Sequence, residues 1–209
     1  MRAKTILIGT GTAVAVALCG CTSGGPFRTF TSGYAGVTDS GYRIPPVPIY
    51  KVDRKYYRQI VPFDAHGEPA GTIFVDTRAK FLYYVLGDGT AMRYGIGVGK
   101  QGFEWRGTAH IEMKREWPEW HPPAEMIVRE RVENGRIIPT YMEGGLKNPL
   151  GARALYLFNE SGDTGYRLHG SPEWWTIGKA VSAGCIRLMN QDIIDLYDRA
   201  EIGAKVIVS

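Results

Sequence analysis

Cys185 stands in the stretch VSAGCIRLMN, residues 181–190, between a glycine and an Ile-Arg pair. The only other cysteines of the chain, Cys19 and Cys21, lie close to its beginning. A cysteine nucleophile needs a base that holds it as a thiolate, donors for the oxyanion that forms on the attacked carbonyl, and exposure at a backbone corner. The residues before and after Cys185 include candidates for all three requirements.

His169 ends a predicted strand and is followed by Gly170, so its imidazole can project from a strand end into a cleft and act as the base. Gly184 allows the chain to turn sharply, which makes the N–H groups of Gly184 and Cys185 candidates for the oxyanion hole. Arg187, two residues beyond the cysteine, is a candidate for binding a substrate carboxylate or for bracing the loop. We also expect Gly170 to contact the substrate.

Two other interpretations of these residues stay open on spacing alone. A lone cysteine is often a small buried hydrophobe, and a lone histidine is often structural. A zinc site built from His121, His169 and Cys185 is the second alternative, although no second close pair of ligands is present.

The elements that must position these residues are mostly β. Short runs rich in β-branched and aromatic residues, separated by turn signals, predict strands. They lie at 71–77, 80–86, 92–98, 108–113, 154–158, 166–169 and 205–208. One helix is predicted over residues 191–200, with Asn190 as its N-cap and Gly203 after its end.

A long connection, residues 114–151, separates two of the predicted strands. A connection of this length in a compact domain is usually functional or disordered, and the Trp and Pro residues around Trp120 argue against disorder. It is a candidate substrate lid or groove wall, with Trp120 as a substrate contact. Alternatively, its tryptophans cover one end of the core.

The N-terminus reads as an export signal, with Arg2 and Lys4 ahead of an apolar run that is too short to span a membrane. Its ending LCGC resembles a bacterial lipoprotein signal, which predicts a signal peptide at residues 1–20 and lipidation of Cys21. An ordinary signal peptide or a Cys19–Cys21 disulfide is the alternative. Loss of residues 1–20 lowers the formal charge from +4 to +2, so the alkaline composition gives little support for a nucleic-acid partner.

Three segments follow the signal. Residues 21–48 are rich in Gly, Ser, Thr and Pro without a sustained period, which predicts a flexible tether. Residues 49–70 form a lead-in that packs on the edge of the domain, and residues 71–209 form the catalytic domain.

The stretch HGSPEWWTIGKAVSAGCIRLMNQDIIDLY, residues 169–197, closely resembles the active-site signature of the YkuD-type L,D-transpeptidases. That signature has a His-Gly, a spacer, and a Ser-x-Gly-Cys followed by an aliphatic residue, Arg and a hydrophobic residue. Upstream blocks such as WPEWHPPAEM and GGLKNPLGARALYL are similar too, so the resemblance covers residues 71–209. Many members carry a second histidine where this chain has Ala183, and no role of that side chain is carried over.

The resemblance implies a β-sandwich-like domain of mixed sheets with one helix after the catalytic cysteine. Cys185 would attack the L,D bond after the third residue of a peptidoglycan tetrapeptide stem, with His169 as base and the Gly184 and Cys185 amides as the oxyanion hole. Ser182 of the signature joins the expected substrate contacts. No metal or organic cofactor is implied.

The acyl acceptor implied by the resemblance is an amine of another stem, which gives a 3-3 cross-link, or an amine of an envelope protein, which gives anchorage. Water as acceptor makes the enzyme an L,D-carboxypeptidase or amidase, and a wall-binding lipoprotein with an inert thiol is the non-catalytic alternative. The expected location is the periplasm, with the lipid on Cys21 as the only membrane contact, in the outer membrane of a Gram-negative cell.

Overall fold

Short runs of β-branched and aromatic residues form the strands, because such side chains pack well on a pleated surface. The computed structural model describes residues 28, 29, 31–100, 105–182 and 184–209. Within these residues, ten strands form one mixed sheet in the order β1-β4-β7-β6-β5-β14-β9-β10-β11-β13. Their bounds are β1 Arg28–Thr29, β4 Gln59–Pro62, β5 Ile73–Asp76, β6 Phe81–Val85, β7 Thr90–Gly95, β9 Gly107–Glu116, β10 Arg153–Asn159, β11 Gly162–Ser171, β13 Ile186–Met189 and β14 Lys205–Val208.

Smaller elements complete the described part of the chain. Strands β2 Val37–Asp39 and β3 Tyr42–Ile44 form an antiparallel pair. Strands β8 Val98–Gly99 and β12 Ala180–Ser182 form a parallel pair. The 3-10 helices are η1 Thr31–Tyr34, η2 Ile49–Lys51, η3 Arg54–Tyr56 and η4 Trp174–Thr176, and the α-helices are α1 Ala124–Asn134 and α2 Asn190–Arg199. None of the helices in the described residues is both long enough and apolar enough to cross a membrane.

One hydrophobic core joins both ends of the large sheet. Tyr94 of β7 belongs to the same buried cluster as Leu188 of β13, although these strands stand far apart in the strand order. The sheet therefore curls around a shared interior, as large twisted sheets tend to do. Helix α2 closes this interior with Ile193 and Leu196, one helical turn apart on one face. The predicted mostly β fold, with mixed sheets and a helix after Cys185, is confirmed.

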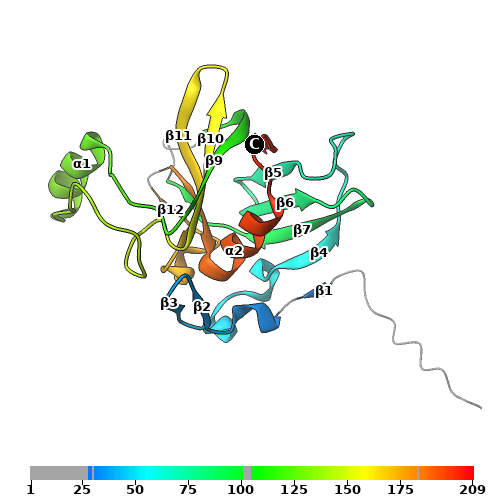
Figure 1. Cartoon of the computed structure of the whole chain (residues 1–209), viewed down its shortest axis with the longest axis horizontal. Coiled ribbons are helices and arrows are strands. Elements are labelled where there is room, and N and C mark those ends of the chain that lie inside the picture. Colours follow the sequence, from blue (N-terminus) through cyan, green and yellow to red (C-terminus); the bar gives the residue numbers. More distant parts are fainter. Residues whose placement is uncertain (1–27, 30, 101–104, 183) are drawn as a thin grey trace, which may run out of the picture.

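The long connection holds a helix, α1, for which the sequence shows no buried apolar stripe. Helix α1 has no buried residue, and it projects away from the sheet (Figure 1). Val128 and Val132 lie exposed on it, so it lacks the buried apolar face by which a helix is usually recognised. In the described residues, α1 therefore adds to the helix predicted after Cys185, which is present as α2.

Residues 31–48 differ from the predicted flexible tether. They contain the β2–β3 hairpin, and both Tyr34 and Ile44 are buried. The Asp39 carboxylate accepts hydrogen bonds from the Arg153 guanidinium at 2.7 and 2.8 Å and from Trp117 Nε1 at 2.7 Å. These contacts fix the hairpin on the domain, so the tether prediction is corrected over residues 31–48. Cys19, Cys21 and the rest of residues 1–27 lie outside the described residues.

The N-terminal segment also reaches the start of helix α2. The Tyr34 hydroxyl donates to Asp192 Oδ2 at 3.2 Å and accepts from the Arg58 backbone N–H at 2.6 Å. Asp192 is fully buried, and burial raises the pKa of its carboxyl to about 7, against the opposing effect of the Arg58 guanidinium 3.9 Å away. Strand β4, which follows Arg58, pairs with β7 and makes the predicted lead-in part of the sheet.

Candidate active site

Strands β11 and β13 run parallel, and their pairing decides where His169 and Cys185 lie. The register sets Leu168 opposite Ile186 and His169 opposite Arg187. Cys185 immediately precedes β13, two residues before Arg187. Because side chains alternate along a strand and paired residues share a face, Cys185 and His169 fall on the same face of the strand pair. The other face carries Leu168 and Ile186 into the core.

His169 is buried, and the Gly170 backbone carbonyl orients its ring. Its Nδ1 lies 2.6 Å from the Gly170 carbonyl oxygen. A carbonyl only accepts, so Nδ1 carries the proton and Nε2 keeps its lone pair. Burial lowers the pKa of His169 to about 3, and the positive charge of Arg187 acts in the same direction, while the carbonyls of Gly170 and Leu150 oppose it. His169 is therefore neutral at physiological pH and able to accept a proton through Nε2.

Cys185 is half-buried and is a free thiol. Burial raises the pKa of the thiol, against the opposing effects of a hydrogen bond with the Arg167 backbone and the positive charges of Arg167 and Arg187. Both shifts, on Cys185 and on His169, disfavour an ion pair at rest. At rest the two groups are therefore a neutral thiol and a neutral imidazole on one face of the strand pair, which differs from the thiolate expected from the sequence.

Ser182 holds the turn before the cysteine. Its buried Oγ accepts from the Gly184 N–H at 3.2 Å and donates to the Cys185 carbonyl at 2.6 Å. Gly184 has a φ of 130°, a backbone conformation that residues other than glycine rarely adopt. The Gly184 N–H predicted for the oxyanion hole is thus already used inside the loop. Ser182, predicted as a substrate contact, instead braces the turn that presents Cys185.

Gly170 was also predicted to contact substrate, and the structure gives it a packing role. A Cβ on Gly170 would clash with Asn190 Oδ1 and would lie 2.9 Å from Ile193 Cγ2. A Cβ on Gly151, which has φ of 63°, would clash with the same Asn190 oxygen. The two glycines therefore let β11 and the chain after Leu150 meet the start of α2 without side chains between them, which brings the Leu150 carbonyl toward His169.

The Asn190 side chain connects the start of α2 to the chain after Gly151. It is the first residue of α2 and not its N-cap, which is Met189, so the predicted capping role is corrected. Its Oδ1 is engaged instead by the Ala152 N–H at 2.9 Å. A buried amide that loses its acceptor is costly, so this bond fixes the chain after Gly151 against β11.

We expect Asn190→Ala to lower the free energy of unfolding by about 1–3 kcal/mol, because it leaves the buried Ala152 N–H without a partner. Urea unfolding followed by circular dichroism measures this change. Asp198→Ala, at an exposed position on the same helix, is the matched control and should stay within about 0.5 kcal/mol of the parent. Equal stability of the two variants would remove Asn190 from this role.

Arg187 stabilises the site through contacts with Glu173 and Gly97. Its Nη1 donates to Glu173 Oε2 at 2.8 Å, and its backbone exchanges two hydrogen bonds with Gly97 at 2.8 and 2.9 Å. Of the two roles predicted for Arg187, the structure displays the bracing one. Its Nε is buried and has no hydrogen-bond partner in the described residues.

Trp120 and His121 belong to the long connection. The Trp120 backbone exchanges hydrogen bonds with Met142 at 2.8 and 2.9 Å, which joins the two arms of the connection. The structure thus gives the predicted substrate contact Trp120 a role in loop packing. His121 is exposed and lies 3.4 Å from Glu119. No three His, Cys, Asp or Glu side chains gather as metal ligands in the described part of the chain, which contradicts the zinc alternative.

Three further residues of the site were missed from sequence. Arg167, Leu150 and Asn190 act on Cys185 or on the surroundings of His169. Arg167 could have been found from the sequence, because it lies two residues before His169 in a predicted strand and its side chain is therefore on the same face of that strand. The Leu150 carbonyl and the Asn190 amide leave no comparable signal, because a contact across the fold sets each role.

Comparison with known proteins gives a consistent family. The model of the family described as YkuD, L,D-transpeptidase catalytic domain, matches residues 70–208. The probable L,D-transpeptidase YbiS of Escherichia coli strain K12 is 32% identical over 151 residues, 70% of this chain and 46% of that protein. The probable L,D-transpeptidase ErfK/SrfK of Salmonella typhimurium is 34% identical over 131 residues, 61% of this chain and 40% of that protein. The chain thus spans about half the length of the curated relatives it matches.

Among solved structures, a Brucella melitensis protein described as a probable carnitine operon oxidoreductase is 48% identical to this chain. The similarity covers 78% of this chain and 99% of that one, with a TM-score of 0.49.

Proposed function

Because the chain belongs to the L,D-transpeptidase catalytic-domain family, we propose that it cleaves the L,D bond after the third residue of a peptidoglycan tetrapeptide stem and transfers the acyl group to an amine. The observation that carries this proposal is the pairing of β11 with β13, which sets His169 and Cys185 on one face with the His169 Nδ1 committed to Gly170.

The first half-reaction forms a thioester. As Cys185 Sγ attacks the carbonyl carbon, its proton passes to His169 Nε2, and the carbonyl oxygen becomes an oxyanion. Because the Gly184 N–H already donates to Ser182 Oγ, we assign stabilisation of the oxyanion to the Cys185 N–H. The intermediate then collapses, the C–N bond breaks, and the terminal D-alanine leaves with the proton from the imidazolium.

The second half-reaction reverses these roles. An acceptor amine attacks the thioester carbonyl and gives a proton to His169, and collapse breaks the C–S bond. The imidazolium returns this proton to the cysteine sulfur, so the site ends as the neutral pair from which it started. General-base catalysis suits this resting state, because deprotonation accompanies attack and needs no preformed thiolate.

The acceptor is proposed to be the amine of another stem or of an envelope protein. We place the reaction in the periplasm, with the chain anchored to the outer membrane through lipid on Cys21. These proposals rest on the sequence of residues 1–48 and on the family.

The test of the function is a product assay with disaccharide-tetrapeptides. We expect the purified protein to release D-alanine and to give products whose mass matches a stem dimer or, with an added amine, an amide. Tripeptide as the sole product would replace transfer by hydrolysis. Unchanged substrate, together with an unmodified Cys185 in intact-mass spectra, would favour a wall-binding lipoprotein.

A further inference from the structure

A groove of about 350 Å³ lies beside the reactive strand pair. Its lining includes Pro45 and Pro46 of the N-terminal segment together with Trp174 and Trp175. Asn190, at the start of α2, also lines it. We call this the proline–tryptophan groove. None of the reaction steps above uses it.

Hydrogen bonds from Gln191 hold the proline part of the groove in place. The Gln191 side-chain amide donates to the Pro45 carbonyl at 3.0 Å and to the Ala35 carbonyl at 3.3 Å. Proline fixes φ, so a wall that contains Pro45 and Pro46 loses little further freedom when a ligand binds. The rings of Trp174 and Trp175, which also line the groove, meet edge to face at 5.6 Å between ring centroids. A groove organised in this way binds without a large ordering cost.

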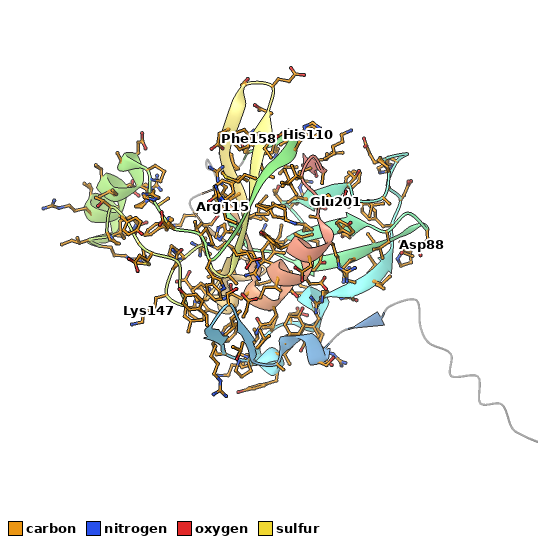
Figure 2. All side chains as sticks on the ribbon, viewed as in Figure 1. Asp88, His110, Arg115, Lys147, Phe158 and Glu201 are labelled. Atoms are coloured by element: carbon orange, nitrogen blue, oxygen red, sulfur yellow. The ribbon has the colours of Figure 1, made fainter. Side chains whose placement is uncertain are left out.

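The lining is uncharged. None of the side chains that line the groove belongs to Asp, Glu, Lys, Arg or His. The charged neighbour of Leu146, Lys147, points away into solvent (Figure 2). An ionic ligand would find no counter-charge here, and its desolvation would be uncompensated.

The lining combines exposed apolar surface with neutral polar groups. Trp175 is 51% exposed and Leu146 39% exposed, while Ser171, Asn190 and Gln191 add hydroxyl and amide groups. Aromatic surface with a few convergent polar groups is typical of a small-molecule site. An uncharged, hydroxyl-rich ligand with apolar ring faces, such as a sugar, satisfies both parts of the lining.

The distance to the reactive pair fits a sugar that is joined to the stem peptide. Ser171 lies two residues beyond His169 on β11, about 7 Å along the strand and on the same face. Three residues of an extended stem span about 10 Å between the sugar and the scissile carbonyl. A stem attacked by Cys185 can therefore leave its sugar in the groove.

We propose that the proline–tryptophan groove binds the saccharide to which the stem peptide is attached, with Trp175 as its stacking surface. The proposal rests on the proposed function and adds a specificity: the enzyme prefers stems that carry sugar over free peptides.

The experiment compares a disaccharide-tetrapeptide with the same tetrapeptide without sugar. We expect Trp175→Ala to raise KM about 10-fold for the disaccharide substrate with kcat unchanged, and to leave the free peptide unaffected. Trp175→Phe, which keeps an aromatic face, should retain most of the preference. Tyr50→Ala removes an aromatic side chain that is 80% exposed and outside the groove, and should change neither substrate.

The peptide-free disaccharide is also titrated into the protein and followed by NMR, which decides sugar binding even if neither substrate turns over. Absence of turnover with saturable, Trp175-dependent sugar binding would overturn the function but keep the groove assignment. No saturable binding, or equal loss on both substrates in Trp175→Ala, would overturn the groove assignment. So would a dimer in light scattering that Trp175→Ala converts to monomer, because a second copy would then be the occupant.

Discussion

Replacing Cys185 with alanine is expected to lower both transfer and hydrolysis of tetrapeptide stems by at least about 1,000-fold, because no other group in the mechanism can form the acyl intermediate. The release of D-alanine measures the loss. Intact mass after incubation with substrate should show an acyl adduct on the parent protein and none on the variant.

The control for this variant is its fold. Cys185 is half-buried and lies just outside β13, so loss of Sγ removes little packing. Urea unfolding of Cys185→Ala should therefore stay within about 1 kcal/mol of the parent. Activity that survives in a folded Cys185→Ala protein would contradict the assignment of the nucleophile.

Replacing His169 is expected to lower the rate about 100- to 10,000-fold, the usual contribution of a general base. The shape of the pH profile carries more information than this loss. In the parent protein the pKa of His169 is about 3, so the base stays neutral and the rate should not follow its ionisation between about pH 5 and 8. In His169→Ala only the small thiolate fraction reacts, and the rate should rise about tenfold per pH unit until the raised pKa of Cys185 is reached.

His169→Gln controls for the cavity that alanine leaves at this buried position. It should show the same sloped profile as His169→Ala. A flat profile in both variants would mean that another group takes the proton.

The same residue links stability to pH. The pKa of His169 falls from 6.5 to about 3 on folding, so the unfolded chain binds the extra proton between these values. The contribution of the neutral imidazole to stability is therefore complete above pH 6.5 and is lost as the pH falls toward 3. In His169→Gln this part of the acid sensitivity should be absent from urea unfolding measured at pH 7 and pH 5.

The sheet could be predicted from sequence because its strands are short runs of β-branched and aromatic residues between turn signals, and such runs depend only on local sequence. The run Ile73–Asp76, for example, forms β5 inside the predicted strand at residues 71–77. Helix α1 could not be predicted in this way, because it packs on nothing and so carries no buried stripe. The folded structure of residues 31–48 could not be predicted either, because Tyr34 and Ile44 are single buried anchors in a Gly- and Pro-rich segment and form no period.

At the site, the sequence indicated Cys185 and His169 as candidate reactive side chains but not the contacts that hold each of them. The Ser-x-Gly-Cys block predicts a nucleophile at Cys185, yet it does not reveal that the Gly184 N–H bonds to Ser182 Oγ inside the turn. Asn190 has the right type for an N-cap, but the Ala152 N–H, 38 residues away, takes its oxygen. Such roles depend on contacts across the fold, which no local pattern records.

The burial of Asp192 sets a lower limit on the autonomous folding unit. The matched family region begins at residue 70, yet the hydroxyl and guanidinium that meet this carboxyl come from Tyr34 and Arg58. A chain cut at the family boundary would keep a carboxyl inside the protein while discarding both of its partners. The folding unit is therefore larger than the matched family region and includes Tyr34 and Arg58.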